Sequence, residues 1–135
     1  MKYSLDTNTC IGYLSGRSPA IRRKLPTIPA GQIVVCSVVR AELAYGVAKS
    51  NHPEASAEKH REFLAPYASL PFDDQAAAIY GRVRKVLEAN GTPIGPYDMQ
   101  IAAIALVHNL ILITRNMREF SRIEGLQIEN WENNA

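Results

Sequence analysis

Apolar residues along this 135-residue chain form short continuous runs that alternate with longer stretches of helical spacing. Residues 2–5, 32–36 and 110–113 are short runs with little internal alternation, a pattern typical of strands buried on both faces of a parallel sheet. A further short strand is expected at residues 127–129. The alternation predicts an α/β fold: a central, mostly parallel, twisted sheet of about four to five strands, covered by helices on both faces.

The stretches between these runs predict helices that begin at capping residues and end at glycine or proline. Ser18, Ser37 and Asp73 are expected N-caps, and Gly16 and Gly91 are expected to end the helices before them. The predicted helices cover residues 10–14, 19–25, 38–49, 54–67, 74–90 and 99–109.

Length and composition indicate one globular domain. A chain of 135 residues can bury a core without disulfides, and no repeat or linker divides residues 1–135. No run of about 18 apolar residues predicts a membrane span, and no basic segment followed by an apolar core predicts a secretory signal. Cys10 and Cys36 lack metal-ligand spacing and are expected to be reduced core thiols. We therefore expect a cytoplasmic protein.

Basic residues are clustered although the net charge is only +2. The clusters lie at residues 22–24, 82–85 and 115–122. If some of the acidic side chains surround a cation, the remaining surface is basic enough to suit a phosphate-rich partner. Solvated helix faces remain the alternative explanation.

Three carboxylates stand in unusual settings. Asp6 directly follows the first strand. Glu42 lies on or beside a helical stripe that is expected to face the core and that holds Val38, Val39, Tyr45 and Gly46. Asp98 lies in the first turn of an apolar helix, after a loop fixed by prolines and glycines. Each also has a simpler explanation: a helix cap at Asp6, an edge position reaching solvent for Glu42, and the helix dipole for Asp98.

A parallel sheet would bring these groups together. The strands at residues 2–5 and 110–113 both end at the edge where open α/β sheets bind ligands. Asp6, Glu42, Asp98 and the turn holding Asn116 and Glu119 are therefore expected to meet in one cleft. A site of oxygen ligands without His or Cys suits Mg²⁺ or Mn²⁺ better than zinc. Such a site favours phosphoryl chemistry.

Several motifs at these positions resemble those of PIN-domain ribonucleases, and more closely the VapC toxins of type II toxin–antitoxin systems. They are Asp-Thr-Asn at 6–8, Arg-Ala-Glu-Leu at 40–43, Gly-Pro-Tyr-Asp at 95–98 and Thr-Arg-Asn at 114–116. Further similarity at 91–93, 118–120 and 129–131 extends the resemblance from end to end.

The resemblance implies a three-layer α/β/α PIN domain with Mg²⁺-dependent endoribonuclease activity, in which Mn²⁺ can substitute. It implies a homodimer that forms a hetero-oligomer with a VapB-type antitoxin, whose C-terminal segment occupies the active-site groove. The subgroup is similar to VapC proteins that cut initiator tRNA in the anticodon loop, so tRNA is the expected substrate.

Position by position, the resemblance assigns Asp6, Glu42 and Asp98 as acidic catalytic residues and metal ligands. The fourth position, often Asp in PIN domains, is Asn116, which brings no charge; Glu119 is the alternative source of that charge. Substrate binding is expected from Thr7, Thr114, Arg115 and Arg118.

Two other functions remain open from the sequence. An Asp-Thr pair at a strand end also occurs in phosphatases with an aspartyl nucleophile, but these usually have a second Asp two residues on, where this chain has Asn8. The chain could also be a catalytically weak or inactive PIN-like module that acts by binding RNA or protein.

Overall fold

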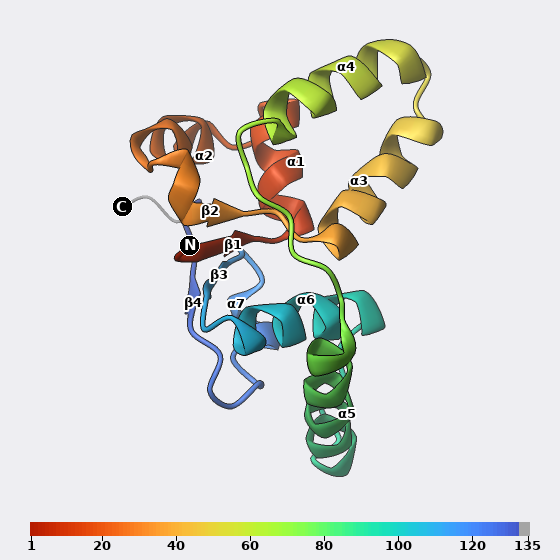
Figure 1. Ribbon diagram of the computed structural model, residues 1–135, viewed down its shortest axis with the longest axis vertical. Helices are drawn as coiled ribbons and strands as arrows, with labels where there is room; N and C mark the ends of the chain where they lie inside the picture. The colour runs from red at the N-terminus through yellow and green to blue at the C-terminus, as the bar shows by residue number, and fades with distance from the viewer. Residues whose placement is uncertain (133–135) are drawn as a thin grey trace.

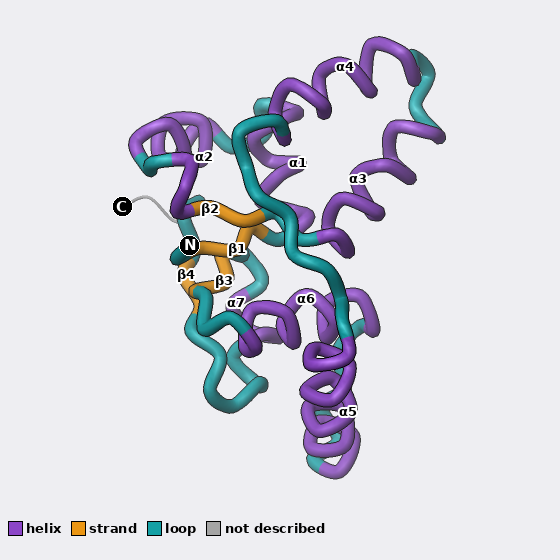
Figure 2. Tube along the Cα trace, viewed as in Figure 1, coloured by secondary structure: helices purple, strands orange, loops and turns teal. Residues whose placement is uncertain are grey.

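A computed structural model describes residues 1–132 of the chain. Its four strands form one sheet in the order β2-β1-β3-β4, and every neighbouring pair is parallel. Figures 1 and 2 show the sheet as a short central layer. The strands are β1 (Tyr3–Leu5), β2 (Ile33–Val34), β3 (Ile111–Ile113) and β4 (Ile128–Glu129). The predicted parallel sheet is confirmed, with strands shorter than expected.

Helices cover both faces of the sheet, which confirms the three-layer α/β/α arrangement. In Figure 1, α1 and α2 lie on one side of the strands and α6 and α7 on the other, while α3 and α4 form an arm that projects away from the sheet. The helices are α1 (Thr7–Ser15), α2 (Pro19–Lys24), α3 (Ser37–Ala48), α4 (Pro53–Leu64), α5 (Asp74–Ala89), α6 (Pro96–Val107) and α7 (Met117–Phe120), with 3-10 turns at η1 (Leu25–Thr27) and η2 (Ala30–Gln32).

Most predicted helix ends are confirmed, and the exceptions have local causes. Ser18 and Asp73 cap α2 and α5 through their side chains. Ser37 was expected to cap α3, which is wrong: the helix begins at Ser37 itself, and Cys36 takes the N-cap position without a side-chain hydrogen bond. The helix α4 ends at Leu64 rather than residue 67, because Pro66 has no N–H to continue the helical hydrogen bonds.

The register of the sheet sets the position of the site. Leu5 in β1 pairs with Ile113 in β3, and the Asp6 N–H donates to the Ile113 carbonyl at 3.0 Å. Asp6 and Thr114 therefore leave neighbouring strands at the same edge. The chain passes from β1 to β2 on one side and returns to β3 on the other, and such a reversal is where open α/β sheets bind ligands.

The core lies between the sheet and the inward faces of the helices. The central part of α6 is buried all round, whereas the apolar side of α5 is only partly buried: Ala76 and Leu87 are inside but Val86 is 49% exposed. Trp131 is buried and its ring lies 5.0 Å from that of Tyr3, edge to face, so it packs against the first strand. Cys10 and Cys36 are free and buried.

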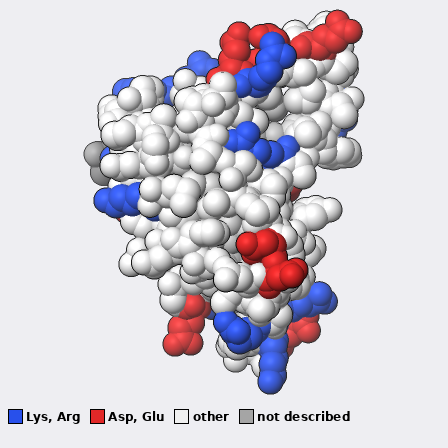
Figure 3. Space-filling view, viewed as in Figure 1, with Lys and Arg blue, Asp and Glu red and all other residues white. Residues whose placement is uncertain are grey.

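Charged side chains gather at two ends of the face seen in Figure 3, over α4 and α5, and the surface between them is largely uncharged. The predicted outward orientation of the basic residues of α5 is confirmed, because Arg82, Arg84 and Lys85 are all exposed. Within residues 1–132, no helix is both long and apolar enough to cross a membrane.

Candidate active site

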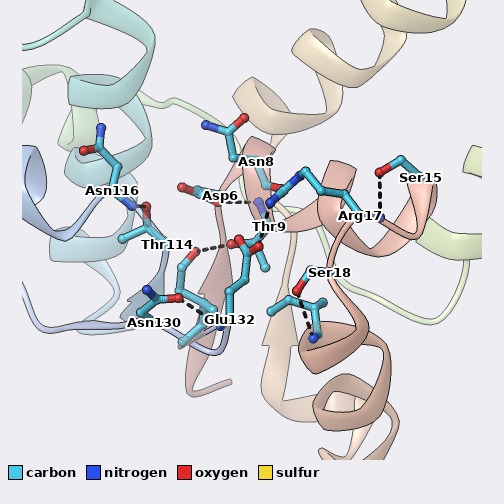
Figure 4. A network of polar contacts seen from close by, with 12 residues as sticks. Asp6, Asn8, Thr9, Ser15, Arg17, Ser18, Thr114, Asn116, Asn130 and Glu132 are labelled. Carbon is cyan, nitrogen blue, oxygen red and sulfur yellow. Dashed lines mark hydrogen bonds and ion pairs between the residues drawn. The ribbon is translucent and has the colours of Figure 1, made fainter. Parts of the chain in front are cut away.

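Asp6 is both a helix cap and a residue of the cleft, so the two explanations offered for it do not exclude each other. Its carboxylate accepts a hydrogen bond of 2.8 Å from the Thr9 N–H and thereby caps α1. The Thr9 hydroxyl donates to the Ile113 carbonyl at 3.1 Å, which ties the start of α1 to β3. Figure 4 shows Asp6 between Thr9, in the first turn of α1, and Thr114, which follows β3.

The Asp6 carboxyl is 4% exposed. Burial raises its pKa, while hydrogen bonds from Thr114 and Thr9 oppose that rise and the negative charge of Glu132 adds to it. A carboxylate has about four lone-pair positions, so these hydrogen bonds leave it capacity to bind a cation. Asp6 is therefore fixed in place without being fully satisfied.

Glu42 is held at the opening of the cleft by α3. The Thr7 hydroxyl donates a 2.6 Å hydrogen bond to Glu42 Oε1. The expected inward stripe of α3 is confirmed only in its first half: Val38 and Val39 are buried, but Tyr45 is 67% exposed. Glu42 therefore faces a cleft rather than the core, which explains why a carboxylate is tolerated among apolar neighbours.

Asp98 lies in the first turn of α6, after Gly95 at the N-cap. Its pKa is raised to about 6, first by burial and then by the negative charges of Asp6, Glu42 and Glu119. Asp98 therefore lies within electrostatic range of Asp6, Glu42 and Glu119.

One cleft brings together the three acids expected as metal ligands. It has a volume of about 940 Å³, which is within the range of ligand sites and far larger than a metal ion alone needs. Its walls come from α1, α3 and the start of α6. The lining residues are Asp6, Thr7, Asn8, Ile11, Ser37, Val38, Ala41, Glu42, Tyr45, Gly46, Lys49, Tyr97, Asp98 and Gln100.

The turn after β3 completes the edge of the site. Thr114 was expected to bind substrate, but it is fully buried, accepts a hydrogen bond of 2.9 Å from the Asn116 N–H and supports Asp6. Thr114 therefore lies behind Asp6, in a position to support that carboxylate. Arg115 and Arg118 are exposed, and Asn116 and Glu119 are partly buried. Of the last two, Glu119 is the one whose charge reaches Asp98.

The donor set suits a hard divalent cation. All four acids offer oxygen ligands, and their mutual repulsion raises the pKa of Asp98, so a cation among them would relieve that repulsion. As residues 1–132 are arranged, no group of three or more His, Cys, Asp or Glu side chains lies close enough together to hold a metal ion. Binding an ion would thus draw in carboxylates such as Glu42, whose side chain is held only by Thr7.

Two supporting residues were missed by the sequence interpretation. Arg17 donates to Glu132 Oε1 at 2.7 Å and to the Asn8 carbonyl at 2.9 Å, so this pair braces the first turn of α1 from behind. In Figure 4, Asn116 lies on one side of Asp6 and Thr9, and Arg17 and Glu132 lie on the other. The two residues are 115 positions apart and have no local pattern that could have revealed them.

With the fold and cleft established, comparison with known proteins defines the class. A family model described as the PIN domain matches residues 3–126. The chain belongs to the PIN domain family and, within it, to the VapC group. The resemblance noted in the sequence motifs is therefore confirmed.

Relatives of this group match the chain over nearly its full length. The "tRNA(fMet)-specific endonuclease VapC" of Salmonella typhimurium is 38% identical, covering 97% of this chain and 98% of that protein. "Ribonuclease VapC2" of Rickettsia felis is 36% identical, covering 98% and 99%.

Solved structures show the same fold. A complex of VapBC2 from Rickettsia felis bound to a DNA fragment from its promoter contains a chain with a TM-score of 0.91, 36% identity and coverage of 97% of this chain and 99% of that one. DNA-bound VapBC from Salmonella typhimurium also gives a TM-score of 0.91, with 38% identity and coverage of 97% and 98%.

Proposed function

We propose that this protein is the toxin of a type II toxin–antitoxin pair and acts as a metal-dependent endoribonuclease in the cytoplasm. The observation that carries the proposal is the meeting of Asp6, Glu42 and Asp98 in one cleft, with Glu119 close enough to act on Asp98. Carboxylates that repel one another gain no stability from gathering. Their arrangement is explained by a cation that a reaction requires.

The side chains of the cleft have distinct roles in this proposal. Asp6, Glu42 and Asp98 would hold Mg²⁺, or Mn²⁺ in its place, with Glu119 or Asn116 at the fourth position. When bound, the ion supplies positive charge to the phosphate oxygens and lowers the pKa of a water ligand. Thr9 and Thr114 keep Asp6 in position, and Thr7 orients Glu42.

Substrate contacts are proposed at the rim of the cleft. Arg115 is exposed on the turn that follows β3 and Arg118 is exposed on α7, and their guanidinium groups can hold the phosphates on either side of the cut. Thr7 lines the cleft and can also donate to a phosphate oxygen.

We propose tRNA as the substrate, with the anticodon loop of initiator tRNA as the site of cleavage. Support comes from the relative at 38% identity whose name specifies tRNA(fMet). Because the structural relatives are VapBC complexes, we also propose a VapB-type antitoxin as the inhibitor. The toxin is proposed to form a homodimer and a hetero-oligomer with that antitoxin.

The decisive experiment is sequencing of cellular RNA ends after induction of the wild type and of Asp6→Ala. New ends in the anticodon loop of initiator tRNA that require Asp6 would support the proposal. The purified protein should make the same cut with Mg²⁺ and lose activity in EDTA. Growth arrest without new RNA ends in either strain would point instead to an inactive PIN-like module, and a phosphoenzyme trapped on Asp6 would point to a phosphatase.

A further inference from the structure

Two tyrosine rings project into solvent beside the acidic cluster. Tyr45 is 67% exposed and Tyr97 is 58% exposed, and both line the cleft that contains Asp6, Glu42 and Asp98. Among residues 1–132 these are the aromatic side chains that are exposed. Large exposed apolar side chains that gather at one site usually mark a binding surface, and neither ring supports the core.

The face of α3 that borders the cleft carries three chemical groups in order. Glu42, Tyr45 and Lys49 are spaced by three and four residues, so they lie along one face of the helix. With a rise of about 1.5 Å per residue, Tyr45 lies roughly 4.5 Å and Lys49 roughly 10 Å beyond Glu42 along the axis. The Lys49 ammonium lies 4.8 Å from the centre of the Tyr45 ring.

We propose that Tyr45 and Tyr97 stack on unpaired bases of single-stranded RNA on either side of the cleaved phosphate, and that Lys49 binds a neighbouring phosphate. This inference rests on the proposed ribonuclease function. An RNA strand alternates anionic phosphates with aromatic bases, and α3 presents a carboxylate for a metal, then a ring, then a cation. Tyr97 directly precedes Asp98 and places a second ring beside the same carboxylates.

Stacking also provides attraction that the negative charge of the cleft does not oppose. Four acids repel a polyanion until a cation is bound, so a strand needs attraction that does not depend on charge. Stacking on an aromatic side chain contributes about 1–3 kcal/mol per base and tolerates different bases. An apolar peptide segment would leave the carboxylates and the Lys49 ammonium beside these rings without partners, whereas an RNA strand with its metal ion supplies a partner for each.

The test compares ring removal with hydroxyl removal. Purified Tyr45→Ala, Tyr97→Ala, Tyr45→Phe and Tyr97→Phe are assayed for KM and kcat on an anticodon stem–loop RNA. Each Ala variant should raise KM by about 5- to 150-fold, the equivalent of the stacking energy, with kcat within about threefold of the wild type. Each Phe variant should match the wild type. An unchanged KM in both Ala variants, or Phe variants as impaired as Ala, would overturn the proposal.

A binding measurement separates this inference from the proposed activity. RNA carrying 2-aminopurine in its loop is titrated with Asp6→Asn, which is expected to bind without cutting. Fluorescence should be quenched on binding, and quenching should be lost when Tyr45→Ala or Tyr97→Ala is added. Quenching with a wild type that cuts no RNA would preserve the stacking surface and reject the nuclease. Cleavage without any tyrosine-dependent quenching would support the nuclease activity and reject the stacking surface.

Lysine variants and the antitoxin complete the test. Lys49→Ala should weaken RNA binding and reduce the slope of log affinity against log salt concentration by about one. Lys59 is exposed on α4 and does not line the cleft, so Lys59→Ala should change neither quantity. If the tyrosine variants lose affinity for a VapB-type antitoxin while RNA cleavage stays normal, the surface docks a protein and the proposal is wrong.

Discussion

The hydroxyl of Thr7 and the carboxylate of Glu42 are joined by a 2.6 Å hydrogen bond, although the residues are 35 positions apart. Thr7 is the first residue of α1 and Glu42 lies within α3, so the bond links two walls of the cleft. The same pair positions Glu42 beside Asp98, whose pKa responds to its charge.

Loss of the Thr7 hydroxyl should weaken the site without unfolding the protein. Hydrogen bonds to charged groups contribute about 1.5–3 kcal/mol, so Thr7→Val should reduce kcat/KM by roughly 10- to 100-fold. Thr7→Ser, which keeps the hydroxyl, is the matched control and should stay within a few-fold of the wild type. Equal activity in all three proteins would mean that Glu42 does not depend on Thr7.

The two roles of Asp6 can be separated by substitution. Asn is as good an N-cap as Asp, whereas Ala is poor and costs about 0.5–2 kcal/mol. Asp6→Asn should therefore keep the metal-free melting temperature within about 2 °C of the wild type or raise it, while Asp6→Ala should lower it by several degrees. Both should abolish cleavage. Equal, large losses of stability would show that the carboxylate is structural.

Magnesium should raise the melting temperature of the wild type, because a ligand that binds only the folded state stabilises it. The increase should be smaller in Asp6→Asn and Asp98→Asn, each of which removes one negative ligand. Thermal unfolding over a Mg²⁺ titration measures this difference. A Mg²⁺ effect of the same size in all three proteins would place the ion elsewhere.

Asp98 should make the free energy of unfolding of the metal-free protein fall as pH rises. Its pKa is 3.8 ordinarily and about 6 in the folded protein, so the folded state holds the proton more tightly. The stabilisation is present below about pH 4 and is lost as pH rises to about 6. After allowance for partial exposure we expect about 1 kcal/mol. In Asp98→Asn this part of the pH dependence should vanish, while Glu62→Gln, exposed on α4, should retain it.

The uncharged fourth position gives a further prediction. Because the charge of Glu119 reaches Asp98, Glu119→Gln should weaken Mg²⁺ binding by roughly 10-fold or more, in the range of 1–3 kcal/mol for a lost charge-assisted contact. Asn116→Ala should weaken it less. Isothermal titration with Mg²⁺ distinguishes the two, and a larger loss for Asn116→Ala would assign the fourth position to Asn116.

Local patterns were sufficient for much of the architecture. The apolar runs identified three of the four strands, Ser18 and Asp73 marked true helix starts, and the apolar surface of α6 identified it as buried. These features follow from short-range sterics, capping and burial, which a sequence displays directly. The predicted stripe of α3 is buried at Val38 and Val39 but not at Tyr45, because periodicity identifies one face of a helix but not what that face contacts along its length.

The sequence by itself determined which carboxylates were out of place, namely Asp6, Glu42 and Asp98, and that parallel strands would bring them to one edge. Only the tertiary structure decided how they are held. The hydrogen bond from Thr7, the brace from Arg17 to Glu132 and the charge of Glu119 near Asp98 join segments far apart in the chain. Hydrogen bonds and Coulomb interactions depend on distance in space, which the fold sets and the order of residues does not record.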